Sequence, residues 1–321
     1  MNGIPLTFSE HQINRTVIGE WTNTSPEALN ISVIMLIDGG THFKVNAFDN
    51  LLSCNFDSII AIEKRNDTFS IEEIAKRYPK VKFIIPKEET TEGEMINLAM
   101  GEITSEYVLV LKDTLNIPQN MINKNLAQKL IQKGDYCIVP RLLDKNKNGL
   151  STHYNPCAEK SHFVIDSSFV VSEGVQTLYP FDFIALYNRK KFIRLGGFDY
   201  TIKSPYWQNL DLALRSWLFD ERTTLTTMLQ FSYVDEVPLE DRTVNIDYLR
   251  YYLKNEVPRI NNGEGYLKHG SFFKFYKQST CGYMEARRQY KCAKEWVKAN
   301  KYRFKNDLMG FIQGWSQSDE N

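Results

Sequence analysis

Short apolar runs alternate with amphipathic stretches along the first 140 residues of the chain. Runs rich in Ile and Val are typical of strands buried in a parallel sheet, and apolar residues spaced three and four apart predict helices. The predicted strands are 31–37, 58–62, 81–85, 107–111 and 136–140, and the predicted helices are 43–52, 70–78, 92–102 and 116–133. Because the two alternate through short loops, we expect an α/β fold with a mostly parallel sheet between layers of helices.

The rest of the chain predicts fewer strands. Its predicted elements are the strands 183–187 and 224–233 and the helices 189–195 and 207–219. The stretch 145–172 is polar, contains Gly and Pro and has no assigned element, which is typical of a functional loop. We therefore divide the chain into an N-terminal arm or loose cap at 1–30, an α/β domain at 31–240 and a mainly helical region at 241–321.

The composition agrees with a folded globular protein. Hydrophobic residues make up 42% of the 321 residues. No run approaches the ~18 apolar residues that a membrane span needs. The segment Met1 to Trp21 has no basic start followed by an apolar core, so we expect no signal peptide and a cytoplasmic location. The five cysteines are scattered, which argues against a disulfide framework or a zinc cluster.

Polar side chains follow three of the predicted parallel strands. Asp38 follows the first strand, Glu63 the second, and Lys112 and Asp113 the fourth. Ligands of parallel α/β sheets bind at the carboxyl ends of the strands, so we expect these residues near a ligand. The alternative is a turn or cap role for the aspartates and a solvated ammonium for Lys112.

Four sequence strings, in a fixed order, resemble those of one enzyme family. They are Ile31-Ser-Val-Ile-Met35, Asn97 with Ala99, Glu106-Tyr-Val-Leu-Val-Leu111, and Leu195-Gly-Gly-Phe-Asp199 with Trp207 and Asp211-Leu-Ala-Leu-Arg215. Over residues 30–238 the chain resembles the family 2 glycosyltransferases, whose GT-A fold is a Rossmann-like sheet between helices. Spaced strings in the right order are far harder to obtain by chance than any one alone.

The resemblance implies a reaction and a set of contacts. It implies transfer of a sugar, with inversion, from a UDP- or GDP-linked donor to a glycan or lipid-linked acceptor in polysaccharide biosynthesis. The residues that it places at the nucleotide sugar are Asp38, Glu63, Asn97, Lys112 and Asp113. For Asn97, a polar helix residue facing solvent is an equally good interpretation.

The metal motif of the family is altered in this chain. The family holds Mn²⁺ or Mg²⁺ with Asp-x-Asp after the fourth strand, whereas this chain has Lys112-Asp113-Thr114. Asp113 is the one remaining candidate ligand, which argues against the usual metal site. Lys112 offers an alternative, because a fixed positive charge also stabilises a departing diphosphate.

The general base of the family is altered as well. Where the family has Glu-Asp, this chain has Gln208-Asn209, and an amide does not accept a proton at neutral pH. Asn209 therefore marks the base position with its carboxylate lost. Asp211 is the nearby catalytic candidate, against the alternative of an i, i+4 salt bridge with Arg215. A base from elsewhere, such as Asp235 or Glu236, is the other option.

Three functions fit these departures. The first is a glycosyltransferase whose catalysis is weakened or independent of metal. The second is a pseudoenzyme that keeps the fold to bind or scaffold a partner. The third is a nucleotidyltransferase, for which the segment Asp38 to Lys44 is a poor phosphate loop.

The C-terminal region carries a concentrated positive charge. Between Tyr266 and Lys305 there are eleven Lys or Arg and two Glu, a net charge of +9 in a chain whose total is zero. A basic helix with an apolar stripe is typical of a peripheral contact, here with the inner membrane face or with a protein through residues 266–305. The alternative is a helix packed on the acidic body of the protein. No nucleic-acid-binding motif is present, which argues against a nucleic-acid partner.

Overall fold

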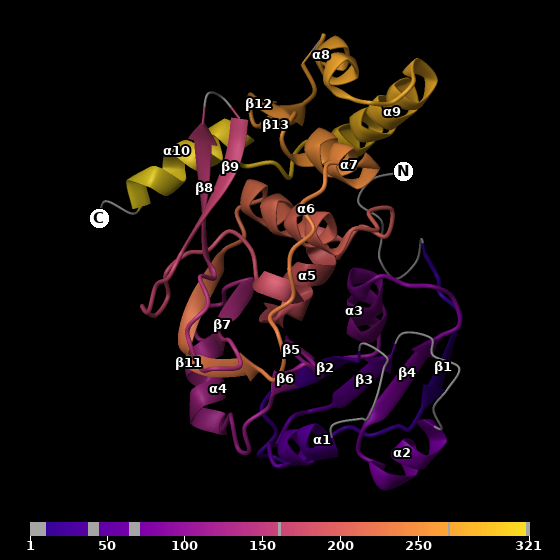
Figure 1. Ribbon diagram of the computed structural model, residues 1–321, viewed down its shortest axis with the longest axis vertical. Coiled ribbons are helices and arrows are strands. Elements are labelled where there is room, and N and C mark those ends of the chain that lie inside the picture. The colour runs from indigo at the N-terminus through magenta and orange to yellow at the C-terminus, as the bar shows by residue number, and fades with distance from the viewer. Residues whose placement is uncertain (1–10, 38–44, 64–70, 160–161, 269, 319–321) are drawn as a thin grey trace.

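The computed structural model describes residues 11–37, 45–63, 71–159, 162–268 and 270–318. A nine-stranded sheet fills the lower half of the molecule in Figure 1, and helices of the C-terminal region lie at the opposite end. The strand order of this sheet is β1-β4-β3-β2-β5-β10-β7-β11-β6.

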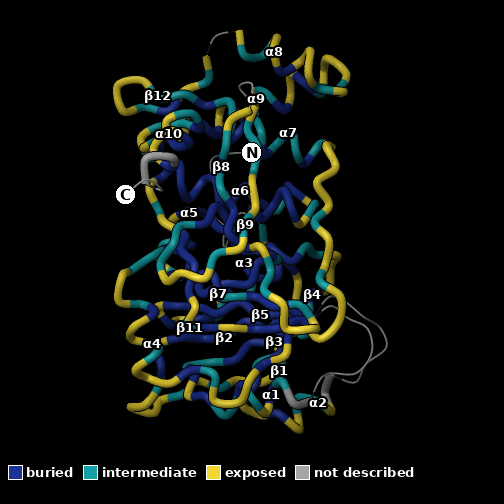
Figure 2. Tube along the Cα trace, turned by 60° about the vertical axis from the view of Figure 1, so that its left-hand side comes forward, coloured by how far each residue is buried: buried dark blue, intermediate teal, exposed yellow. Residues whose placement is uncertain are grey.

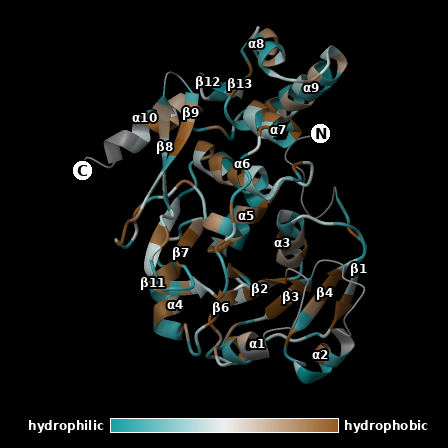
Figure 3. Ribbon diagram, viewed as in Figure 1, coloured by the Kyte–Doolittle hydropathy of each residue, from teal (hydrophilic) through white to brown (hydrophobic). Residues whose placement is uncertain are grey.

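Four parallel strands form the half of the sheet that follows the predicted pattern. They are β4 (Lys82–Pro86), β3 (Ile59–Glu63), β2 (Ile31–Ile37) and β5 (Tyr107–Lys112). Every residue of β2, β3 and β5 is buried, which explains the near-continuous apolar runs, since both faces of these strands are covered. Brown, the colour of hydrophobic residues, is prominent on these strands in Figure 3.

The other half of the sheet is mixed in direction. Strand β10 (Ala185–Asn188) runs antiparallel to both β5 and β7 (Cys137–Leu143). Strand β11 (Thr223–Tyr233) is parallel to β7, and β6 (Leu115–Asn116) pairs with its end. The sheet is thus mostly parallel with one antiparallel strand inserted at its middle, and the α/β prediction is confirmed.

Among the strands that were not predicted, one lies at the edge of the sheet and two lie in the stretch without an assigned element. Strand β1 (Arg15–Ile18) pairs antiparallel with β4, so this part of the expected arm is an edge strand rather than a loose cap. It covers the exposed edge of β4, whose backbone groups would otherwise lack partners. The stretch without an assigned element contains the hairpin β8 (His153–Glu159) and β9 (His162–Ser168). Strand β9 has no buried residue, and therefore its sequence has no alternation of apolar and polar residues that would predict a strand.

Helices cover both faces of the sheet. Helices α1 (Val45–Leu52) and α2 (Ile71–Arg77) lie on one side, and α3 (Glu92–Gly101), α5 (Arg189–Leu195) and α6 (Pro205–Leu218) lie on the other (Figures 1 and 2). The predicted helix 116–133 is shorter, since α4 spans Lys124–Ile131. Asn123 caps it by accepting a hydrogen bond from Leu126 N at 3.0 Å.

The C-terminal region stacks on α6, on the side away from the sheet (Figure 1). Its elements are α7 (Ile246–Asn255), β12 (Arg259–Asn261), β13 (Glu264–Tyr266), α8 (Ser271–Gln278), α9 (Tyr283–Ala299) and α10 (Leu308–Ser318). Its aromatic residues continue the main core, with Trp217 of α6 and Trp315 of α10 in edge contact at 4.9 Å. Within the described ranges, no helix has the length and apolar character to cross a bilayer.

Candidate functional site

Two carboxylates meet at the carboxyl edge of the parallel strands. Glu63 is the last residue of β3, and Asp113 follows β5, where its backbone N–H donates to Leu36 O of β2 at 3.0 Å. Asp38, the third residue predicted at this edge, lies outside the described residues. The edge is therefore defined here by one residue from β3 and one that follows β5.

Burial and charge both act on Glu63. Its side chain is 4% exposed, and burial together with the nearby Asp113 carboxylate raises the pKa of Glu63 above its ordinary value. Among the described residues, its Oε2 atom has no hydrogen-bond partner. A cation, or a hydroxyl donor from a ligand, would stabilise a buried carboxylate oxygen in this condition.

The donor set fits a hard divalent cation only in part. No group of three or more His, Cys, Asp and Glu side chains suited to a metal ion exists in the described part of the chain. Mg²⁺ and related ions, however, are often held by one or two carboxylates together with substrate phosphates. Glu63 and Asp113 supply that smaller set.

Lys112 lies in a buried ion-pair cluster. Its Nζ atom is 2.8 Å from Glu92 Oε1 and 2.5 Å from Asp182 Oδ1, and its side chain is 10% exposed. Burial alone would lower the pKa of Lys112, but the two carboxylates outweigh it and raise that pKa. Its positive charge is thus already balanced by carboxylates of the protein, and its contact with a diphosphate stays a prediction.

Asp182 is a candidate that sequence reasoning missed. It and Phe183 adopt successive left-handed conformations, with φ of 56° and 64°, in the turn before β10. Such non-glycine conformations cost about 1–3 kcal/mol each and cluster at functional sites. Lys112 holds Oδ1, and the Tyr233 hydroxyl donates to Oδ2 at 2.9 Å. No local pattern marks this residue, because both partners are distant in the sequence.

A small cavity places Asp182 beside the base position. The cavity, which we call the Asn209 cavity, has a volume of about 120 Å³. It is lined by Phe181, Asp182, Phe183, Pro205, Tyr206, Asn209 and the segment 238–241. Burial raises the pKa of Asp182, and the ammonium of Lys112 offsets part of that rise. A carboxylate therefore does border the position where the family carboxylate is lost.

The two amides of α6 bind backbone groups. Asn209 Nδ2 donates to Pro180 O at 2.7 Å. Gln208 accepts from Gly93 N at 3.1 Å through Oε1 and donates to Asp199 O at 3.0 Å through Nε2. An ionised carboxylate cannot donate a hydrogen bond, so neither amide can be replaced by its acid without losing one. These contacts give a structural reason for both departures from the family pattern.

We expect Asn209→Asp to lower the free energy of unfolding by about 1–3 kcal/mol at pH 7, because it sets a buried carboxylate against a carbonyl oxygen. Burial should raise the pKa of the introduced carboxyl in the folded state. The deficit should therefore shrink as the pH falls through that pKa, because the neutral form can donate to Pro180 O. Urea denaturation over a pH series measures this. Asn116→Asp, at an exposed strand position, is the control, and an equal loss in both variants would contradict the account.

Asp211 belongs to a buried network between α6 and α7. Its Oδ1 is 2.9 Å from Lys254 Nζ and accepts from Asn255 Nδ2 at 2.8 Å, and its Oδ2 is 3.3 Å from Arg215. Lys254 also lies 2.6 Å from Asp199 Oδ2. Both carboxyl side chains are fully buried, so their two charges are balanced inside the protein by Lys254 and Arg215. The expected i, i+4 pair exists, and a catalytic role for Asp211 stays a prediction.

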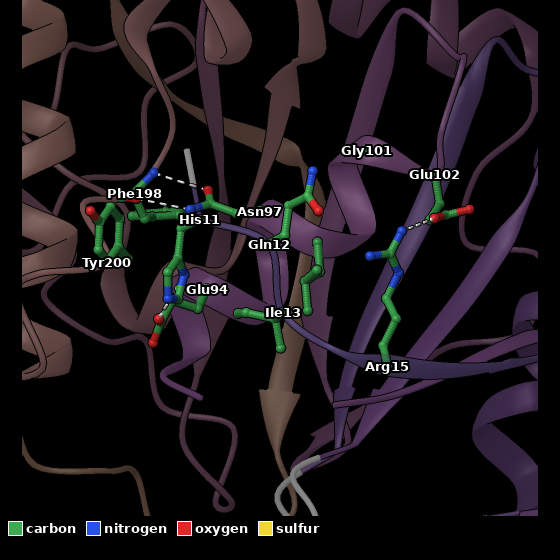
Figure 4. Close-up of a pocket in the computed structure, with 11 residues that line it drawn as sticks. His11, Gln12, Ile13, Arg15, Glu94, Asn97, Gly101, Glu102, Phe198 and Tyr200 are labelled. Atoms are coloured by element: carbon green, nitrogen blue, oxygen red, sulfur yellow. Dashed lines mark hydrogen bonds and ion pairs between the residues drawn. The ribbon is translucent and has the colours of Figure 1, made fainter. Parts of the chain in front are cut away.

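Asn97 joins α3 to the Gly-Gly-Phe turn. Its Nδ2 donates to Phe198 O at 2.8 Å, and its Oδ1 accepts from Phe198 N at 3.0 Å. Figure 4 shows it in the wall of a cavity of about 210 Å³ between the N-terminal segment and α3. There His11 stacks on Tyr200 with ring centroids 4.2 Å apart. Glu63, Lys112 and Asp113 do not line this cavity, so Asn97 and the strand-end carboxylates belong to different places.

The two other candidate bases follow β11 at the surface. Asp235 is exposed, and Glu236 is exposed and paired with Lys145. Neither lines the Asn209 cavity. A base role for either stays a prediction.

No family model and no curated protein sequence matches this chain. Among solved structures, it resembles that of GalNAc-T7 with UDP, GalNAc and Mn²⁺, at 9% identity and a TM-score of 0.63. The match covers 94% of this chain and 60% of that one. The chain has the GT-A fold.

At this identity the likeness concerns the fold alone, and the chain spans only 60% of the GalNAc-T7 structure. Two further matches have TM-scores below 0.5. Staphylococcus aureus TarS is 14% identical, and the match covers 70% of this chain and 38% of that one at a TM-score of 0.49. The mannosyltransferase PcManGT from Pyrobaculum calidifontis, in complex with GDP-Man and Mn²⁺, is 10% identical, and the match covers 93% of this chain and 77% of that one at a TM-score of 0.47. The GT-A fold predicted from the four sequence strings is confirmed.

Proposed function

We propose that this GT-A protein is a glycosyltransferase that moves a sugar from a UDP- or GDP-linked donor to a glycan or lipid-linked acceptor. The observation that carries the proposal is the pair formed by the buried Glu63 and the half-buried Asp113 at the carboxyl edge of the parallel strands. This is where sheets of this kind bind nucleotides. The GalNAc-T7 structure, whose fold is similar, holds UDP and Mn²⁺, and this supports a nucleotide donor.

Glu63 and Asp113 are the residues that would hold a divalent cation at this edge. The Oε2 atom of Glu63, which has no hydrogen-bond partner in the described part of the chain, is the atom that best fits this role. A bound Mn²⁺ or Mg²⁺ would supply positive charge to a departing diphosphate. Because both carboxylates must be ionised to bind it and the pKa of Glu63 is raised, metal-dependent donor binding should weaken on acidification sooner than at an ordinary glutamate.

Asp182 is our proposed proton acceptor. It borders the Asn209 cavity, and its raised pKa favours uptake of a proton. In the proposed step the acceptor hydroxyl gives its proton to Asp182, and its oxygen bonds to the reacting sugar carbon. The bond from that carbon to the diphosphate breaks, and the nucleoside diphosphate leaves. Lys112 and Tyr233 position Asp182 for this step.

The second candidate is a binding protein that keeps the fold without catalysis. Gln208 and Asn209 favour it, because both amides are committed to backbone contacts where the family has acids. Under this proposal the strand edge still binds a nucleotide, but no sugar is transferred.

A thermal-shift panel of UDP- and GDP-sugars, with and without Mn²⁺, tests the proposal. We expect one donor to raise the melting temperature. Asp113→Asn should abolish the shift. Asp182→Asn should keep it but reduce the release of nucleoside diphosphate about 10²- to 10⁴-fold. A shift without any release by the wild-type protein would favour the binding protein, and no shift with any nucleotide sugar would refute both.

A further inference from the structure

The corner between α8 and α9 exposes four large apolar side chains. Phe273, Tyr276, Tyr283 and Met284 are 68%, 38%, 51% and 75% exposed. Tyr276 and Tyr283 meet edge to face with centroids 5.7 Å apart, and Phe272 contacts both rings. The ring of Phe272 also contacts Phe273, and Met284 follows Tyr283 in the first turn of α9. We call this group the α8–α9 corner, and exposed apolar patches of this kind mark interaction sites.

The corner lies at one extreme of the molecule. Figure 1 places α8 at the end opposite α1 and α2, beyond α6 and α7. Most residues of α8 are exposed (Figure 2). The sheet and its strand-end carboxylates lie at the other end. A partner bound at the corner would therefore leave the carboxyl edge of the sheet uncovered.

Positive charge surrounds the corner. Helix α8 has two lysines and no acidic residue. Helix α9 has five Lys or Arg against two Glu. The exposed cations of the two helices include Lys274, Lys277, Arg287, Arg288 and Lys291, of which Arg288 pairs with Glu285 at 2.7 Å. Since the segment 266–305 carries +9 and the rest of the chain −9, this end of the protein attracts anions.

The apolar stripe of α9 is not part of this surface. Ala286, Ala293, Trp296 and Val297 are buried against the protein. The helix packs on the body of the protein, as the alternative interpretation expected, while its charges face solvent, and the peripheral contact stays a prediction. The apolar side chains that remain exposed come from α8 and from the first turn of α9.

We propose that the α8–α9 corner docks on the surface of an anionic lipid bilayer. Its Phe, Tyr and Met side chains would enter the boundary between headgroups and acyl chains, and the flanking Lys and Arg would contact anionic headgroups. Charge complementarity selects the partner, and the patch of exposed apolar side chains favours a bilayer over a purely electrostatic contact. The proposal does not depend on the transfer activity.

Sedimentation of the full chain with vesicles tests the proposal. We expect binding to vesicles that contain phosphatidylserine and little binding to vesicles of phosphatidylcholine alone. Each Lys or Arg near an anionic surface strengthens binding about fivefold. The pair Lys277→Glu and Arg287→Glu should therefore weaken binding by more than about tenfold. Phe273→Ser with Met284→Ser should also weaken it about tenfold, through lost apolar burial.

Lys76→Glu with Lys129→Glu is the matched control, because both lysines are exposed on α2 and α4 and the charge change is the same. Its affinity for the vesicles should stay within about twofold of the wild type, because salt screens charges that lie far from the bound surface. Equal effects of the two charge reversals would overturn the proposal. Unchanged vesicle binding by the variant Phe273→Ser with Met284→Ser would also overturn it. A third contrary result would be stronger binding to polyuridylate, a probe for an RNA partner, than to the vesicles.

Discussion

Replacing Lys254 by methionine should lower the free energy of unfolding by about 3–5 kcal/mol, the largest stability effect that we expect from a single substitution. Lys254 is 1% exposed and lies 2.6 Å from Asp199 and 2.9 Å from Asp211. Without its ammonium, two buried carboxylates face each other with Arg215 as the only nearby cation of the described network. Removing one partner of a buried ion pair leaves a buried charge that is only partly compensated, here by Arg215.

Urea denaturation measures this effect, with Lys298→Met on the exposed side of α9 as the control. Although burial alone would raise the pKa of Asp199, the ammonium of Lys254 lowers it from 3.8 to about 2. The stability that this pair contributes is present above the ordinary Asp pKa and is lost as the pH falls towards about 2. The two variants should therefore differ most at neutral pH. Equal stability of both would contradict the account.

Lys112→Met should cost about 3 kcal/mol of stability, because it leaves Glu92 and Asp182 buried without their shared cation. The double variant Lys112→Met with Asp182→Asn should recover part of the loss, because one of the two carboxylates is then removed. The coupling between the two substitutions, measured by urea denaturation of all four proteins, should be about 0.5–3 kcal/mol.

This cycle also separates two roles for Lys112. If the lysine positions Asp182, Lys112→Met should keep nucleotide binding in the fraction that folds while losing nucleoside diphosphate release. If it clamps the diphosphate, as the sequence suggests, nucleotide binding should fall with a small change in stability. Additive losses in the cycle would argue against the buried cluster.

The parallel half of the sheet was predictable because strands that are buried on both faces are apolar at nearly every residue. Strands β2 and β5 are buried throughout, and their apolar runs mark them to within one residue. Strand β9 has no buried residue and β1 lies at an edge, so neither run differs from a polar loop. Their pairing depends on partners far along the chain, which no local pattern records.

The candidate site was predictable only where it follows strand order. Glu63 and Asp113 come together because their strands lie on either side of β2. In parallel α/β sheets the carboxyl ends of such strands lie at one edge, where ligands bind. Asp182 could not be predicted, because its candidate role depends on contacts with Lys112 and Tyr233, which are 70 and 51 residues away in the sequence. From the sequence, Gln208 and Asn209 indicate only that two carboxylates of the family pattern are missing. The structure shows in addition the backbone groups that the two amides bind.

Calorimetric titration of UDP and of GDP, each with Mn²⁺, into the wild-type protein and Asp113→Asn tests the central claim most directly. The account predicts saturable binding of one nucleotide to the wild type and a loss of about tenfold or more in affinity in the variant. Asp166→Asn, at an exposed position of β9, should bind as the wild type does. Absence of binding by both nucleotides, or equal affinity in wild type and Asp113→Asn, would contradict a nucleotide site at this edge of the sheet.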